Sequence, residues 1–218
     1  MLNSIIHTKR FVVLLFMILM INPILSQEDE AKPEGEEVLA ELQDALKWDD
    51  ETTQKVGKAM VGFKENMATT MTKYEDDENA DPQKMIGDMK KVKGDYEKEL
   101  EGILGKDGLK AYNEYVEKVM LEIFADIAEI RLLDLKPKTS LTDEQIEELA
   151  PPMGKGYLDL MRTIFKYGDK KMNKRTKIKL GKELKKIQSD IQSALNKTLT
   201  EGQQAALAKY KEEQKEKQ

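Results

Sequence analysis

The chain has 218 residues, of which 35% are charged, with a formal net charge of −5 and no cysteine. Without cysteine there can be no disulfide framework, no Cys nucleophile and no cysteine zinc site. The single histidine, His7, stands in the leader-like segment at the start of the chain. Histidine catalysis is therefore excluded from the rest of the protein, which leaves carboxylate chemistry, oxygen-ligated metals and non-catalytic binding.

Residues 1–26 have the layout of a cleavable secretory signal. Lys9 and Arg10 precede the apolar run FVVLLFMILMI at 11–21, and the small residue Ser26 comes directly before Gln27. The run is shorter than the roughly 20 residues of a membrane-spanning helix, although an uncleaved anchor is the alternative. We expect a mature chain that begins at Gln27 and is periplasmic or secreted.

The mature chain changes charge along its length. Residues 27–37, QEDEAKPEGEE, are acidic and polar and are expected to form a flexible spacer. Residues 27–134 contain 29 acidic and 15 basic residues (net −14), whereas residues 135–218 contain 12 acidic and 19 basic residues (net +7). We expect an acidic helical unit at 38–134 and a basic helical unit at 135–218. Opposite charge favours association between the halves or with charged partners.

Apolar residues recur at helical spacing, and segments with the alternation of β-strands are absent. The clearest stripe predicts a largely buried helix at 112–130. We predict an all-α fold of antiparallel helical hairpins, with about six to eight helices. The stripe consists of Tyr112, Val116, Val119, Ile123, Ile127 and Ile130, widened by Leu121 and Phe124.

Helix ends are expected at several turn-forming sequences. Asp81-Pro82 offers an N-cap followed by Pro in the first turn. Further breaks are expected at Gly105–Gly108, Pro137, Pro151-Pro152, 167–169 and 196–198.

Similar strings recur about 90 residues apart. KKVKGDY at 90–96 resembles KKIQSDI at 185–191, and the dipeptide KY occurs at 73–74 and at 166–167. Two diverged tandem copies explain these pairs. The alternative is that lysine-rich amphipathic helices resemble one another by composition.

A motif L-T-x-x-Q occurs twice, in SLTDEQIEEL at 140–149 and in TLTEGQQAAL at 198–207. With Thr142 as the N-cap, Gln145 completes a capping box, while Leu141 and Ile146 form a hydrophobic staple. The second motif repeats the box but has Gln204 at the staple position. Because the poorer helix start keeps the same three residues, the motif suggests a role beyond capping.

This pair of motifs in an exported, cysteine-free helical chain resembles the Spy/CpxP family of periplasmic proteins. The resemblance implies a helical cradle, usually an antiparallel dimer, that shields unfolded envelope proteins without ATP; CpxP-like members also regulate an envelope-stress sensor kinase. The first half departs from the pattern, since Leu104–Gly108 lacks the Thr and the Gln. The motif residues carried over are Leu141, Thr142, Gln145, Leu199, Thr200 and Gln203.

Residues 166–186 form a basic region with ten Lys or Arg residues and two acids. A basic amphipathic helix can bind membrane surfaces, anionic partners or acidic segments of unfolded proteins, and the alternative is an ordinary solvated face. Nucleic acid is not expected, because the mature chain is acidic and the cluster lacks interleaved aromatic residues. The candidate client-binding residues are Lys170, Lys171, Lys174, Arg175, Lys177 and Lys179.

Two kinds of metal site partly fit the sequence, but neither a metal nor a cofactor is expected. Thioethers bind Cu(I), but the six methionines of the first half at helical spacing are more typical of core or of an adaptable surface. Asp77, Asn79, Asp81 and Asp88 fit an EF-hand count, yet Pro82 stands where the loop needs Gly. The methionines are Met60, Met67, Met71, Met85, Met89 and Met120.

Together with these patterns, the resemblance to the Spy/CpxP family leads us to expect a non-enzymatic, ATP-independent chaperone-like protein that binds unfolded or stress-damaged envelope proteins. One alternative is an accessory protein that regulates a membrane sensor, either an envelope-stress sensor or a metal-responsive one. Another is a non-catalytic structural helical protein. An enzyme using carboxylates would need a buried acidic pair in a pocket. The oligomeric state stays open, with a homodimer among the expected states.

Overall fold

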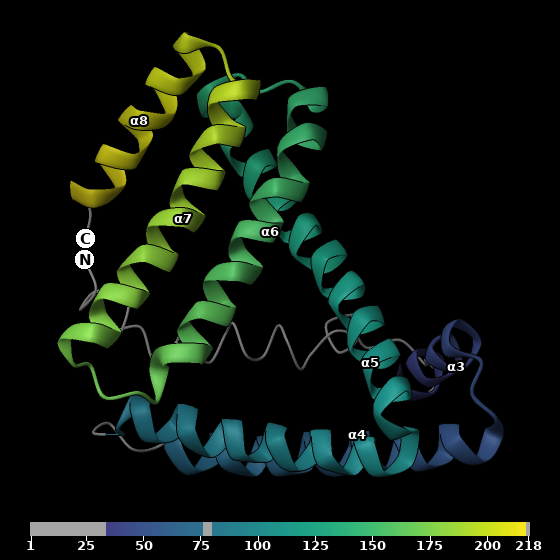
Figure 1. The fold of residues 1–218 in the computed structure, drawn as a ribbon. Helices are drawn as coiled ribbons and strands as arrows, with labels where there is room; N and C mark the ends of the chain where they lie inside the picture. The colour runs from purple at the N-terminus through teal and green to yellow at the C-terminus, as the bar shows by residue number, and fades with distance from the viewer. Residues whose placement is uncertain (1–33, 76–79, 217–218) are drawn as a thin grey trace. The chain divides into compact units, whose positions relative to one another are not determined.

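The computed structural model describes residues 34–75 and 80–216, and the expected signal sequence lies outside them. Every regular element in these residues is an α-helix, so the fold is all-α. None of these helices is long and apolar enough to cross a membrane. The helices are α3 (Glu34–Leu46), α4 (Asp50–Glu75), α5 (Pro82–Thr139), α6 (Asp143–Gly168), α7 (Lys174–Thr198) and α8 (Glu201–Glu216) (Figure 1).

The chain forms two compact units, one up to Glu114 and one from Tyr115 onward. Helix α5 contributes to both units and is interrupted once, at Gly105, where φ is 68° and ψ is 176°. This backbone conformation is nearly restricted to glycine, so Gly105 separates the helical stretches 82–104 and 106–139. The charge boundary at 134/135 is a different division, because residues 115–134 belong to the second unit by contact.

Unit 1 is built by α3, α4 and the first part of α5. Phe63 of α4 stacks on Tyr96 of α5 with 4.4 Å between ring centroids, and the hydroxyl groups of Tyr96 and Tyr112 lie 3.0 Å apart. Trp48 stacks on Tyr112 from the turn before α4. Burial raises the pKa of both tyrosine hydroxyls, which stay protonated. The buried apolar side chains of this unit include Leu42, Val56, Met67, Met85, Ile86, Met89 and Leu100.

Unit 2 is organised by α6 and α7, which pack against each other in antiparallel directions. The start of α6 lies beside the end of α7, where Lys197 Nζ is 3.2 Å from Glu148 Oε1. The other ends meet where Lys166 Nζ is 2.7 Å from Glu183 Oε1. The core gathers where α5 and α7 end and α6 and α8 begin, and contains Ala128, Leu132, Leu141, Ile146, Leu149, Ala150, Met153, Leu195 and Leu199.

Two local expectations are corrected by the helices, and a third is confirmed. The spacer is expected to extend to residue 37, but α3 begins at Glu34. The break expected at Pro137 is confirmed, since α5 ends at Thr139, but Pro151-Pro152 lies inside α6 without ending it. The carbonyls that lose helical donors at these two prolines belong to Glu147 and Glu148, which are exposed to water. Packing of the neighbouring Leu149, which is fully buried, holds α6 together there.

The helix at 112–130 is less buried than its apolar stripe predicts. Ile130 is 60% exposed, and the Val and Ile residues before it in the stripe are only half-buried. The face that turns inward carries Phe124, which lies at the edge of the predicted stripe, together with Ala128 and Leu132, all nearly inaccessible. Both faces have helical spacing, so the pattern alone does not choose between them.

Candidate functional site

Both L-T-x-x-Q motifs begin helices in the same way. At the start of α6, the Gln145 amide N–H donates to Thr142 Oγ1 at 3.2 Å, and the Thr142 N–H donates to Gln145 Oε1 at 3.1 Å. At the start of α8, the Gln203 N–H donates to Thr200 Oγ1 at 3.3 Å, and the Thr200 N–H donates to Gln203 Oε1 at 3.0 Å. Each motif is therefore a capping box that satisfies backbone donors at a helix start.

The two glutamines also hold each other. Gln145 Nε2 lies 3.0 Å from Gln203 Oε1, and Gln203 Nε2 lies 2.8 Å from Gln145 Oε1. Each side-chain amide then donates to a carbonyl two residues before the other cap: Gln145 to Thr198 at 2.8 Å and Gln203 to Ser140 at 2.9 Å. We call these two side chains and the two carbonyls the glutamine clasp.

The clasp explains why the spacing L-T-x-x-Q occurs twice. It joins the turn before α6 to the turn before α8, residues 58 apart in the chain. The leucine of each motif, Leu141 or Leu199, is buried in the core directly beneath. Leucine, threonine and glutamine thus act as core anchor, helix cap and cross-link, and no group in the clasp is a nucleophile or a strong acid or base.

The opposite end of the α6–α7 hairpin is held by a second polar cluster. Lys166 Nζ and the Tyr167 hydroxyl both donate to Glu183 Oε1, at 2.7 and 2.8 Å. The hydrogen bond from Lys166, followed in size by the one from Tyr167, holds the pKa of the Glu183 carboxyl below its usual value. The hairpin is fixed at both ends, which gives α7 a defined outer surface.

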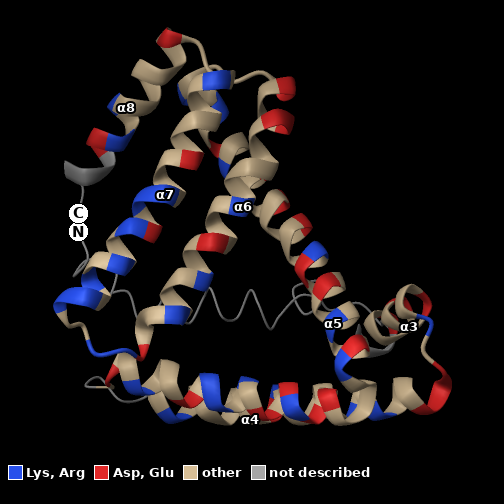
Figure 2. Cartoon of the chain, viewed as in Figure 1, with Lys and Arg blue, Asp and Glu red and all other residues tan. Residues whose placement is uncertain are grey.

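That outer surface is strongly basic. By helical periodicity, one side of α7 carries Lys and Arg around Ile178, while Leu180 is buried on the other side. These cations are all exposed and make no side-chain ion pair with any residue that the structure describes. Ile178 is itself 50% exposed. We define the basic face as Lys174, Arg175, Lys179, Lys182, Lys185 and Lys186 with Ile178 (Figure 2).

The structure brings together only part of the candidate set predicted from sequence. Lys174, Arg175 and Lys179 belong to the basic face, and Lys177 is an exposed neighbour in the first turn of α7. Lys171 lies in the turn before α7, and Lys170 lies over the Tyr167 ring at 5.1 Å. The candidate set omits Lys182, Lys185, Lys186 and Ile178. These residues follow Lys174 and Arg175 at helical spacing, in steps of three and four, and that spacing could have shown from the sequence that they share one face.

The side chains considered as metal ligands have structural roles in the described residues. Asp81 accepts from the Gln83 N–H at 2.9 Å as the cap of α5, and Asp88 accepts from the Tyr74 hydroxyl at 2.5 Å. Asp77 and Asn79 lie outside these residues. Met67, Met85 and Met89 are buried, while Met60, Met71 and Met120 are half-buried. No group of three or more carboxylates or histidines able to hold a metal occurs in 34–75 or 80–216.

Comparison of the chain with family models, with curated proteins and with solved structures finds no match. A function for this chain is therefore inferred from the chemistry of its exposed side chains.

Proposed function

We propose that the protein is an ATP-independent, chaperone-like binding protein that captures unfolded or stress-damaged proteins of the cell envelope on the basic face of α7. The observation that carries this proposal is a group of six exposed cations, without described ion-pair partners, arranged around one exposed isoleucine. Cations without partners attract acidic segments over distances of about 8 Å at physiological ionic strength. Ile178 supplies an apolar contact once a segment has arrived.

A mixed basic and apolar surface suits an unfolded chain better than a folded partner. Unfolded proteins expose acidic and apolar side chains together, and no single geometry is required to bind them. Long-range attraction raises the association rate, whereas a small apolar contact permits release without an energy source. This role needs no cavity, because the client lies on a surface.

The proposal is tested by reversing charge on the basic face. In the chain from Gln27, K182E/K186E removes two of its cations, and K84E/K91E makes the same change of net charge on α5. We expect K182E/K186E to weaken binding of a fluorescently labelled, chemically unfolded acidic client about tenfold at low salt, as measured by anisotropy. The control variant should bind like the wild type. Equal binding by all three chains would refute the role of the basic face.

A further inference from the structure

The two units repeat one series of local features at nearly constant spacing. Both α4 and α6 are 26 residues long, and they begin 93 residues apart. Within residues 34–75 and 80–216, the two non-glycine residues with positive φ are Lys47 at 55° and Ser140 at 54°; they precede these helices and are also 93 apart. Such agreement in length and backbone makes α4 of unit 1 and α6 of unit 2 equivalent helices.

The contacts made by these helices repeat as well. In unit 1, Lys73 and Tyr74 donate to Asp88, as Lys166 and Tyr167 donate to Glu183 in unit 2. Phe63 stacks on Tyr96 in unit 1, and the equivalent Gly156 faces Ile191 in unit 2. Position i of α4 therefore corresponds to position i + 93 of α6, and side chains at equivalent positions can be compared.

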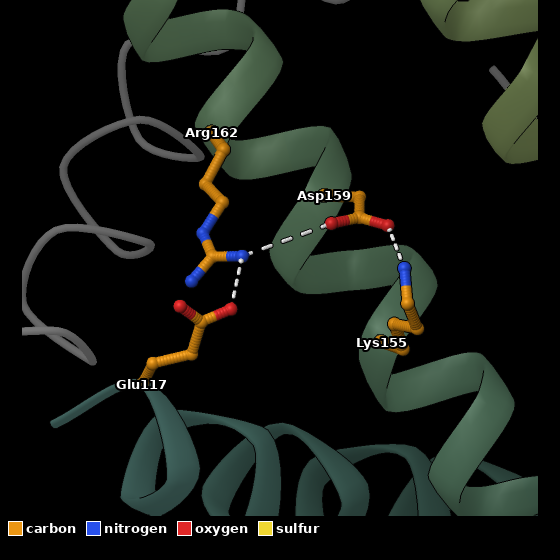
Figure 3. Close-up of polar contacts among 4 residues, drawn as sticks. All are labelled: Glu117, Lys155, Asp159 and Arg162. Atoms are coloured by element: carbon orange, nitrogen blue, oxygen red, sulfur yellow. Dashed lines mark hydrogen bonds and ion pairs between the residues drawn. The ribbon is translucent and has the colours of Figure 1, made fainter. Parts of the chain in front are cut away.

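In unit 2, the end of α5 covers one stripe of α6. A Cβ on Gly154 would lie 2.4 Å from the Ala125 backbone nitrogen, so the two helices touch there without an intervening side chain. Farther along, Arg162 Nη1 lies 3.2 Å from Glu117 Oε1, which links α6 to α5 (Figure 3). Within α6, Asp159 forms ion pairs with Lys155 and with Arg162. The stripe under α5 is buried, and the bulky side chain that fills it is Phe124, 1% exposed.

The equivalent stripe of α4 is open. Val61 stands at the position of Gly154 and is 58% exposed, and Glu65 stands at the position of Leu158, which is 1% exposed. The helix equivalent to the end of α5 is α3, which is described from Glu34 onward and reaches Gly57 through Leu39. Beyond that contact, a groove of about 520 Å³ lies along α4, lined by Leu39, Gly57, Lys58, Val61, Gly62 and Glu65.

We propose that this groove is a docking site for an amphipathic helix of another protein, lying antiparallel to α4 in line with α3 and placing a bulky apolar side chain against Val61. That is the position that α5 fills on α6. The seven residues that precede α3 in the sequence, QEDEAKP, contain three acids and no bulky apolar residue. Their composition therefore offers no side chain comparable to Phe124 as an anchor for the groove. Lys58 and Glu65 favour a partner with an acid near the first and a base near the second.

The test uses the helix that fills the equivalent place. A fluorescent peptide with the sequence of residues 114–133 is titrated with the chain from Gln27, and anisotropy is measured. We expect micromolar binding, at least tenfold weaker for Val61→Asp and for a peptide with Phe124→Asp. Because Val61 is exposed, its substitution leaves the fold intact. Ala111→Asp, which adds the same charge at an exposed position of α5 outside both the groove and the basic face, should bind the peptide like the wild type.

Two outcomes overturn the proposal. One is that the wild-type protein does not bind the peptide, or that the Val61→Asp variant binds it with the same affinity as the wild type. The other is a wild-type dimer in analytical ultracentrifugation that Val61→Asp converts to monomer, since the groove would then be filled by a second copy of this chain. The groove and the basic face are separate surfaces, so client capture can fail while helix docking succeeds, and the reverse.

Discussion

Removing one glutamine of the clasp should lower the stability of unit 2 more than the loss of an ordinary helix cap. The Gln145 side chain takes part in four hydrogen bonds, one with Thr142, one with Thr198 and two with Gln203. At a net value of about 1 kcal/mol for each, reduced by partial exposure, Gln145→Ala should cost about 2–3 kcal/mol. Gln203→Ala should cost about 2 kcal/mol for the same reason.

The two glutamines share two of these bonds, so their effects should not add. We expect a coupling energy of about 1–2 kcal/mol in a double-mutant cycle with Q145A, Q203A and the double variant, measured by urea unfolding. Hydrogen exchange at 140–150 and 198–208 locates the effect at the two helix starts. Additive effects within about 0.3 kcal/mol would contradict the clasp and leave two independent caps.

Three further predictions concern the backbone and the polar clusters. Gly154→Ala should destabilise unit 2 by about 2–4 kcal/mol in urea unfolding, because its Cβ would meet the α5 backbone; the control Gly181→Ala meets nothing within 4 Å and should stabilise by about 1 kcal/mol. Gly105→Ala should cost about 1–3 kcal/mol by the same measurement, because φ of 68° strains any side chain; no loss would show that the break is not needed. The pKa of the Asp88 and Glu183 carboxyls is lowered by their Tyr and Lys donors, so their stabilisation should be complete above the ordinary carboxyl range and vanish as pH falls through the lowered pKa. Unfolding of D88N and E183Q followed by circular dichroism should differ from wild type at pH 7 and converge with it near pH 2.

The helix starts are predictable from sequence because capping is local. Thr142 and Gln145 lie three residues apart, and that spacing alone specifies the bonds between them. The link from Gln145 to Gln203 is not predictable, since it depends on α6 and α7 bringing two distant turns together. The one hint in the residues themselves is that the second motif keeps its glutamine beside a poor staple.

Where local rules mislead, packing outweighs them. Pro151-Pro152 is expected to break a helix, yet Leu149 and Ala150 are buried, while Glu147 and Glu148, whose carbonyls lose a helical donor there, are exposed residues. The stripe that includes Ile130 is expected to be buried, but α5 buries the face of Phe124, Ala128 and Leu132, which shares only its edge with that stripe. Periodicity identifies a helix and its faces, whereas the neighbouring helices decide which face is covered.

The proposed chaperone-like activity is tested most directly by the aggregation of a chemically unfolded client, followed by light scattering without ATP. The chain from Gln27 should suppress aggregation of several unrelated clients near equimolar amounts, and suppression should weaken as salt is raised from about 50 to 500 mM. Unsuppressed aggregation of every client at low salt would contradict the central proposal.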